Sequence, residues 1–470
     1  YLIGEHLGKH NLYIAAVNGI LGHHSGVPNG VRIAEEYALK NSLVRCVVCT
    51  STLAQGVNLP IKYLIVSSIY QSKQIIKVRD FHNLIGRTAR AGKEIEGTII
   101  LTENIYKNSK EKYKLNKYIH LLNAENSEEC SSNLLKLVRK IDLDNNKYLP
   151  INFLRKYISV RYNDNEEYLK IKNSILKRKE QGVEYGAEVF NEMEHILVSL
   201  ENFILSFTEV EDDSFEIIQS TYGYYLANDE EKEELKHIYM LVKSNINSLG
   251  INDKLLYKKC MLGMLKMREL SKSISDNIYE ILNSDFNVLI SIIISNLKEL
   301  EVCKIIPRFL EIESVYELLK LWIGGESYIQ IWNYAKSKNI LIKWGKKSKE
   351  ISLEEIITLC DSDFGYASLT IIQAIIEVLN TKECSKNIQE ELNDLIFRIR
   401  YGLPNKESVY VYELGFADRI ISQKIVNEIR GYDCSTKKKT KSAIKNNREK
   451  LRKLLENYPS YFLNRLEKLR

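Results

Sequence analysis

Three blocks of glycine and polar residues stand in a fixed order in the first hundred positions of this sequence. They run from Gly22 to Gly26, from Thr50 to Pro60 and from Gly86 to Gly92. Hydroxyl side chains at a strand end that turns into a glycine offer side-chain and backbone donors to a phosphate. Arg87 and Arg90 lie three residues apart, on one helical face. Paired guanidinium groups suit bidentate phosphate contact and can stabilise charge that develops on a transferred phosphoryl group.

Alternating helix-like and strand-like segments must position these blocks. We predict a helix over Val31–Lys40 and short buried strands, rich in Val and Ile, over Val44–Thr50, Tyr63–Ser67 and Gly97–Leu101. This alternation is typical of an α/β layer with a parallel sheet. Beyond about Glu103 the strand signal fades, and Leu, Ile and Tyr recur at helical spacing. The helices predicted there are Ala187–Phe207, Glu231–Ser248, Lys254–Leu270, Ser352–Leu379 and Ile388–Tyr401.

Taken together, the blocks resemble the second RecA-like lobe of superfamily 2 helicases. The resemblance is to the superkiller-type branch, which is related to the DEAD/DEAH-box proteins and includes RNA-processing and DNA-repair enzymes. His23 to Gly26 is similar to motif IVa of that family, Thr50 to Pro60 to motif V, and Gly86 to Arg90 to motif VI. The fold implied is an α/β RecA-like lobe followed by a mostly α-helical region. Its parallel sheet would lack its first strand, which in relatives precedes the region around Tyr1.

The resemblance also implies roles for single residues. Nucleic acid would be contacted by His24, Gly26, Arg32, Thr50, Ser51 and Thr52. The nucleotide would be contacted by Gly56, Asn58, Asn83 and Gly86, and Arg87 and Arg90 would be arginine fingers that reach the γ-phosphate of ATP. Two points stay open. Family members usually carry Gln or His where this chain has the shorter Asn83, and Arg32 could hold either nucleic acid or the fold.

Two parts that phosphoryl transfer requires are missing from the sequence. One is a Gly-x-x-x-x-Gly-Lys-Ser/Thr phosphate loop, and the other is an Asp-Glu pair at a strand end. Gly92-Lys93 is followed by Glu94, and Asp229-Glu230-Glu231 opens a polar helix. We therefore expect this fragment alone to hydrolyse no ATP. An upstream RecA-like lobe of the same protein would bind most of the ATP and Mg²⁺.

The helical remainder carries fainter signals. Leu321–Glu326 resembles the start of the family's helical ratchet, and Tyr401–Pro404 with Glu413–Arg419 resembles a helix–hairpin–helix turn. Such a turn can offer backbone N–H groups to a phosphate, although a hairpin packed for its own sake is the alternative. We predict a RecA-like lobe over 1–105, a helical region over 106–285 with a degenerate winged helix or an insertion, a ratchet-like bundle over 286–432, and a basic tail over 433–470.

Composition limits the other possibilities. The formal net charge is +6, but residues 435–470 hold 12 Lys/Arg against 3 Asp/Glu, so the tail could follow a phosphate backbone or be a solvated helix. No apolar run approaches the roughly 20 residues of a membrane helix, and no membrane partner is expected. Eight scattered cysteines suit a reducing cytoplasm, with Cys46 and Cys49 expected in the core.

Other candidate sites are weak. His6 and His10 sit four apart on one predicted helix, as metal-ligand pairs do, but without an acidic partner pattern no metal is expected. Trp322, Trp332 and Trp344 could stack on bases, although burial in the core is favoured.

The leading hypothesis is therefore an ATP-dependent helicase or translocase that acts on single-stranded or duplex nucleic acid, with DNA and RNA both open. The alternative is an ATPase-inactive module that binds nucleic acid or recruits an effector protein. Such a module could serve in a bacterial phage-defence system.

Overall fold

A computed structural model describes residues 1–24, 26–50, 61–71, 74–88, 96–102, 112–139, 151–162, 165–177, 179–180, 183–184, 186–207, 215–283, 286–300, 302–382 and 386–469. The chain divides into two compact units. The first unit comprises Tyr1–Glu129, Glu301–Leu369 and Asn393–Arg470, and the second comprises Cys130–Leu300 and Thr370–Leu392. The domain boundaries at 105, 285 and 432 stay a prediction.

The N-terminal part of the first unit contains the predicted α/β elements. Strands β1 and β2 are parallel, with Ile20 opposite Cys46, and β3 and β6 are also parallel, with Tyr63 opposite Thr98. The predicted helix lies within α3, and the three predicted strands are present with slightly shorter bounds. The elements are α1 (Leu2–Leu7), α2 (Asn11–Val17), β1 (Ile20–His23), α3 (Asn29–Lys40), β2 (Cys46–Cys49), β3 (Tyr63–Val66), β4 (Tyr70–Gln71), β5 (Gln74–Ile75), α4 (Val78–Ile85), β6 (Thr98–Leu101), α5 (Lys112–Leu122) and a 3₁₀ turn at Ala124–Asn126.

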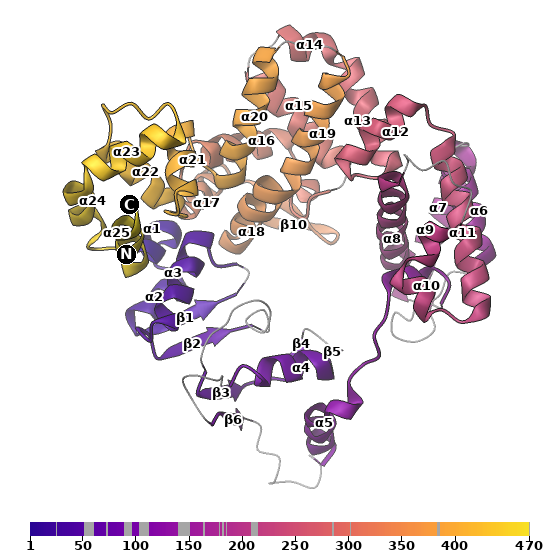
Figure 1. Ribbon diagram of the computed structural model, residues 1–470, viewed down its shortest axis with the longest axis horizontal. Helices are drawn as coiled ribbons and strands as arrows, with labels where there is room; N and C mark the ends of the chain where they lie inside the picture. The colour runs from indigo at the N-terminus through magenta and orange to yellow at the C-terminus, as the bar shows by residue number, and fades with distance from the viewer. Residues whose placement is uncertain are drawn as a thin grey trace. The chain divides into compact units, whose positions relative to one another are not determined.

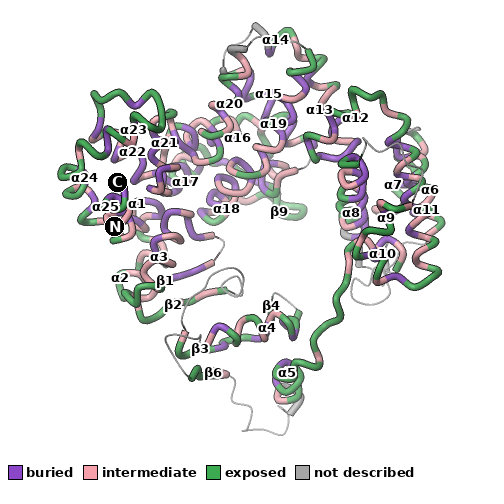
Figure 2. Tube along the Cα trace, viewed as in Figure 1, coloured by how far each residue is buried: buried purple, intermediate pink, exposed green. Residues whose placement is uncertain are grey.

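Among the described residues, strands β2, β3 and β6 each have exposed side chains at alternate positions, so the prediction of buried strands was wrong for one face of each (Figure 2). Along β3, Leu64 and Val66 are buried, whereas Tyr63 and Ile65 are about three-fifths exposed, at 60% and 62%. Successive side chains of a strand point to opposite faces, so this alternation marks a single covered face. Among the described residues, β1–β2 and β3–β6 are separate pairs rather than one sheet. Cys46, expected in the core, is exposed.

The C-terminal part of the first unit is helical. Both chain ends lie beside α1 and α25 (Figure 1), and one hydrophobic core joins Leu2 and Val31 to Phe416, Phe462 and Leu466. The elements are a 3₁₀ turn at Ile306–Arg308, α16 (Ile312–Ile323), α17 (Tyr328–Ser337), β9 (Leu341–Trp344), β10 (Lys347–Glu350), α18 (Leu353–Thr358), a π-helix (Leu359–Ala367), α21 (Lys406–Glu413), α22 (Arg419–Glu428), α23 (Lys437–Asn446), α24 (Arg448–Leu455) and α25 (Ser460–Lys468).

The second unit is almost entirely helical among its described residues. Its elements are a 3₁₀ turn at Asn133–Leu137, α6 (Ile151–Val160), α7 (Asn165–Leu176), β7 (Lys179–Glu180), β8 (Val183–Glu184), α8 (Gly186–Ser206), α9 (Glu216–Gln219), α10 (Tyr222–Leu226), α11 (Asp229–Asn247), α12 (Ile251–Cys260), α13 (Met264–Asp276), α14 (Ile278–Asn283) and α15 (Phe286–Glu299). The chain passes between the units along α19 (Ser368–Asn380) and α20 (Lys386–Tyr401). A buried ion pair joins Arg161 to Glu201, and Glu201 also accepts from the Tyr162 hydroxyl and the Met264 backbone N–H.

Several helix predictions need correction. The single helix expected over Lys254–Leu270 is two helices, because Met261 and Gly263 adopt positive φ of 55° and 78°. The helix expected over Ser352–Leu379 contains the π-helix. One stretch, Leu353–Asn380, has the length and composition of a membrane-spanning helix, but 56% of its most apolar window is buried inside the protein, as is common for core helices.

His6 and His10 do not share a helix, contrary to the prediction. Gly8 ends α1 at φ 63°, and His10 caps the N-terminus of α2. The tryptophans also differ from one another. Trp322 is buried as expected, but Trp344 is 61% exposed, so its prediction was wrong. The Lys349 ammonium lies 4.2 Å from the centre of the Trp344 ring.

Candidate functional site

The structure brings the first residue of motif V, Thr50, to the first residue of motif IVa, His23. Strand β1 ends at His23 and the parallel strand β2 ends at Cys49, so their carboxyl ends meet at one edge. There the backbone N–H of Thr50 donates to the carbonyl of His23 over 3.3 Å. Ligands of open parallel sheets bind outside this edge. The pairing of the two strands therefore places His23 and Thr50 at an edge that a ligand can reach.

The two histidines of motif IVa have different surroundings. His23 is buried, and its Nε2 lies 3.1 Å from Oε1 of Glu36 on α3. His24 is half-buried, and its Nδ1 accepts from the backbone N–H of Gly26 over 3.1 Å. Burial lowers the pKa of His24, and the neighbouring His10 and His23 lower it further. His24 is therefore a neutral group at the edge, and Gly26 closes a tight turn beneath its ring.

A buried carboxyl group lies behind this edge. Glu35 on α3 is only 4% exposed, and burial raises its pKa to about 8, with a further contribution from Glu36. A hydrogen bond from the backbone N–H of Gly22 on β1 opposes this rise. Glu35 is therefore largely protonated at neutral pH. Through this hydrogen bond it joins α3 to β1 without adding a full negative charge beside the β1–β2 edge.

Arg32, one turn before Glu35, has a different environment. Its Nη2 donates to Oδ1 of Asn29 over 3.0 Å. The side chain lines a pocket of about 540 Å³, together with Arg400 and Arg419 from the C-terminal helices. We call this pocket the arginine pocket. Its remaining lining residues are His6, Val27, Pro28, Asn29, Gly30, Trp322, Tyr328, Asp361, Ser362, Gly365, Tyr366, Tyr401, Tyr412 and Asp418.

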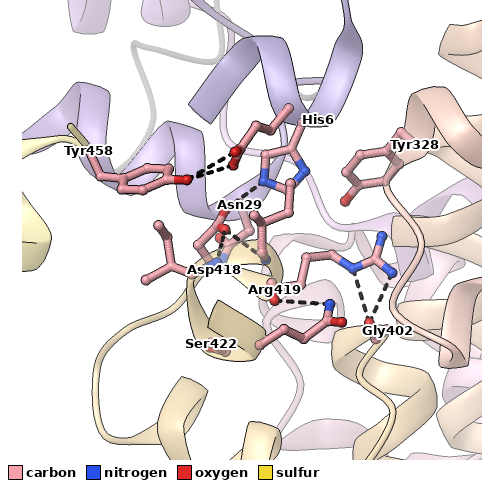
Figure 3. A network of polar contacts seen from close by, with 12 residues as sticks. His6, Asn29, Tyr328, Gly402, Asp418, Arg419, Ser422 and Tyr458 are labelled. Carbon is pink, nitrogen blue, oxygen red and sulfur yellow. Dashed lines mark hydrogen bonds and ion pairs between the residues drawn. The ribbon is translucent and has the colours of Figure 1, made fainter. Parts of the chain in front are cut away.

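A network of buried polar groups fixes one wall of the arginine pocket (Figure 3). His6 Nε2 lies 2.7 Å from Oδ2 of Asp418, and both side chains are 1% exposed. The other oxygen of Asp418 accepts from the backbone N–H groups of Ile420 and Ile421, which caps α22. Burial alone would raise the pKa of Asp418, but His6 and these N–H groups lower it overall. Asp418 is therefore held ionised.

Arg419 forms the next part of this wall. Its Nε and Nη2 donate to the carbonyl of Gly402 over 3.1 and 2.9 Å, and Nη2 also donates to the carbonyl of Trp322 over 2.9 Å. The predicted helix–hairpin–helix segment is thus clamped to α16 through Arg419. Arg400 and Arg419 were not among the predicted site residues. The only sequence signal was the hairpin pattern in which Arg419 stands.

The first residues of motif VI, Gly86 and Arg87, follow the C-terminal end of α4, whose residues Val78 and Phe81 pack in one core with residues of β3 and β6. Asn83 and Gly86 are exposed, whereas Arg87 is only 8% exposed. The helix ends with the N–H of Gly86 donating to the carbonyl of His82 over 2.9 Å. Beyond it, Thr88 forms an isolated parallel bridge with Ile61.

The predicted site is thus only partly assembled among the described residues. His24, Gly26 and Thr50 lie at one edge, and Arg32 faces the arginine pocket. Asn83 lies on α4, and Gly86 and Arg87 follow its C-terminal end. The remaining predicted residues, Ser51, Thr52, Gly56, Asn58 and Arg90, lie outside the described residues. In the part of the chain that the structure describes, no group of three or more His, Cys, Asp or Glu side chains is arranged to hold a metal ion.

Comparison with known proteins adds to these observations. No protein-family model matches the chain. It is 23% identical over 444 residues, 87% of its length, to Hachiman protein HamB of Bacillus cereus, of which it covers 36%. It is 23% identical over 445 residues to the ATP-dependent DNA helicase Hel308 of Methanococcus vannielii, which is 87% of this chain and 53% of that protein. A stretch of 83 residues, 18% of the chain, is 39% identical to the human protein Helicase POLQ-like, of which it covers 8%.

The chain thus spans between about a third and a half of the two relatives that it matches along most of its length. Those relatives and the motifs at the β1–β2 edge agree on one superfamily. This chain is related to the superfamily 2 helicases, and specifically to Hel308, the POLQ-like helicases and Hachiman HamB.

Proposed function

We propose that this chain is the C-terminal part of an ATP-dependent helicase or translocase. Thr50, with Ser51 and Thr52, would contact the strand beside His24 and Gly26. The observation that carries the proposal is the hydrogen bond between the Thr50 N–H and the His23 carbonyl, which joins motif V to motif IVa at the carboxyl edge of two parallel strands. A shift of one motif must move the other. Two contacts with the phosphate backbone would therefore change together.

ATP and Mg²⁺ would be bound mainly by an upstream RecA-like lobe and would supply the phosphoryl chemistry. The residues of this chain that would complete that site are Arg87 and Arg90, as cations toward the γ-phosphate, with Gly56, Asn58, Asn83 and Gly86 at the nucleotide. The exposure of Asn83 on α4 and of Gly86 at its C-terminal cap supports such contact. The low exposure of Arg87 fits a guanidinium that meets phosphate only when the lobes close.

We favour DNA over RNA as the track, because the Hel308 relative is described as a DNA helicase. A second candidate function is an ATPase-inactive binding or scaffold module that works beside an effector protein in phage defence. Similarity to Hachiman HamB over 87% of the chain supports that setting. The two functions differ in one measurable property, which is ATP turnover.

The test is ATPase activity of the full-length protein with and without single-stranded DNA or RNA. We expect DNA to stimulate turnover and Arg87→Ala to lower kcat by at least 100-fold, since removing an arginine finger costs roughly 10³–10⁵-fold. Arg79→Ala removes an exposed arginine from α4, the helix that precedes Arg87, and should leave turnover unchanged. Because Arg87 is buried, Arg87→Lys and a thermal melt of each variant separate loss of fold from loss of the finger.

Two outcomes would contradict the helicase proposal. If the full-length protein binds DNA without hydrolysing ATP, the binding-module function replaces it. If Arg87→Ala and Arg87→Lys both retain wild-type turnover, Arg87 is not an arginine finger.

A further inference from the structure

The arginine pocket concentrates positive charge. Arg32 comes from α3, Arg400 from α20 and Arg419 from the start of α22, so three distant segments place a guanidinium group at one pocket. Among the described residues, no carboxylate oxygen lies within the 4.0 Å of an ion pair from any of the three. Arginines are usually paired when they gather. The pocket therefore has a positive charge that the surrounding protein does not neutralise directly.

Arg419 is the least accessible of the three, at 4% exposed. Its hydrogen bonds go to backbone carbonyls, its guanidinium carbon lies 3.7 Å from the centre of the Trp322 ring, and its Nη1 has no acceptor among the described residues. Burying a cation without a carboxylate partner is costly unless something else favours it. A ligand with negative charge would supply the missing partner.

The two acidic residues that line the pocket, Asp361 and Asp418, do not pair directly with its arginines. Asp418 already binds His6 and caps α22. Asp361 accepts a hydrogen bond of 2.7 Å from the Tyr328 hydroxyl, and burial raises its pKa, which favours its neutral form. Both acids thus make their direct hydrogen bonds with other neighbours, while Arg419 and Arg32 act on Asp361 only through space, where they lower its pKa.

Aromatic rings complete the lining. Tyr366 is 77% exposed, and Tyr401 stacks on Tyr412 with ring centres 4.3 Å apart and planes at 28°. Tyr366 stands on the π-helix, which also brings Asp361 and Gly365 to the pocket. π-helical segments are rare and occur frequently at functional sites. Arginine beside open tyrosine rings is the combination that binds the phosphate and the base of unpaired nucleotides.

We propose that the arginine pocket binds one nucleotide unit, with its phosphate at Arg32, Arg400 and Arg419 and its base against Tyr366 or Tyr401. The volume of about 540 Å³ lies within the roughly 300–1,000 Å³ of small-ligand sites and is too small for a duplex. The inference rests on the proposed function, in that the nucleotide comes from the strand the protein moves along. A free nucleotide has the same chemistry and is the other source.

The test compares binding of single-stranded DNA and of deoxyadenosine monophosphate to the full-length protein. Arg400→Gln removes an exposed charge that makes no hydrogen bond to the described residues, so folding should be unaffected. Lys453→Gln, on α24 away from the pocket, removes an equal charge as the control. We expect Arg400→Gln to weaken binding of DNA and of the monophosphate at least tenfold and Tyr366→Ala to weaken both, with Lys453→Gln near wild type.

Salt dependence sharpens the result. For single-stranded DNA, the plot of log affinity against log salt should become less steep by about 0.7 when one phosphate contact is lost. We expect this change in Arg400→Gln and not in Lys453→Gln. If the monophosphate competes with DNA, the nucleotide of the strand occupies the pocket, and if both bind without competition, a free nucleotide does. Unchanged binding of both probes by Arg400→Gln and by Arg32→Gln overturns the proposal. These readouts need no ATP turnover, so failure of the helicase proposal would be seen separately, in the Arg87 experiment.

Discussion

The buried carboxyl group of Glu35 gives the first unit a pH-dependent stability that one substitution should remove. Its pKa is about 8 in the folded protein, against an ordinary value of 4.5. The folded chain therefore holds a proton that the unfolded chain releases between these two values. This contribution to stability is complete below pH 4.5 and is lost as the pH rises toward 8. At roughly 1.4 kcal/mol per pH unit, the wild type should lose about 3.5 kcal/mol between pH 5 and pH 8 through this group.

Glu35→Gln imitates the protonated acid and cannot titrate. Urea unfolding followed by tryptophan fluorescence is the assay, because Trp322, Trp332 and Trp344 all lie in the first unit. With a slope of about 3 kcal/mol per molar urea, the wild-type midpoint should fall about 1 M more than that of the variant between pH 5 and pH 8. Glu36→Gln is the matched control, and it should keep most of the pH dependence because Glu35 remains. Parallel pH profiles for the wild type and Glu35→Gln would refute the reasoning.

Two further substitutions test the packing of each unit. Gly402→Ala should destabilise the first unit by roughly 2–5 kcal/mol, since its φ is +61° and an added Cβ would lie 2.5 Å from the Trp322 ring. Gly345→Ala has the same φ but nothing within 4 Å, so its fluorescence-detected melting temperature should fall much less, and equal falls would contradict the clash. Glu201→Ala should cost about 3 kcal/mol, because it leaves Arg161 buried with one partner fewer. It should shift the urea transition seen by circular dichroism but not the tryptophan signal of the first unit, and an unshifted transition would contradict it.

Much of the local structure could be predicted from the sequence. Helix α3 and strands β2, β3 and β6 follow from the spacing and type of their apolar residues, which local patterns reveal. Two misplaced helix boundaries also had a visible local cause. Gly8 and Gly263 stand inside the patterns taken as continuous helix, and both adopt positive φ. A glycine within a helical pattern can therefore mark the end of the helix as readily as it can be a tolerated residue inside it.

The arrangement of distant segments was not predictable in this way. The pattern of β3 does not reveal that its second face, with Tyr63 and Ile65, is open, because coverage depends on other parts of the chain. The arginine pocket was missed for the same reason. Arg32 and Arg419 line one pocket because long-range contacts, among them the pair of His6 and Asp418, join the N-terminal segment to the start of α22. The roles of Thr50 and Arg87 came from resemblance and stay a prediction.

The shared core of the two chain ends has a consequence during synthesis. Leu2 and Val31 leave the ribosome roughly 430 residues or more before their partners Phe462 and Leu466. At roughly 5–20 residues per second, the early apolar side chains must wait on the order of half a minute or more for that surface. Contacts of such long separation also form slowly. The nascent lobe is therefore a natural client for chaperones, and a premature stop before α25 should produce an aggregating fragment rather than a smaller functional one.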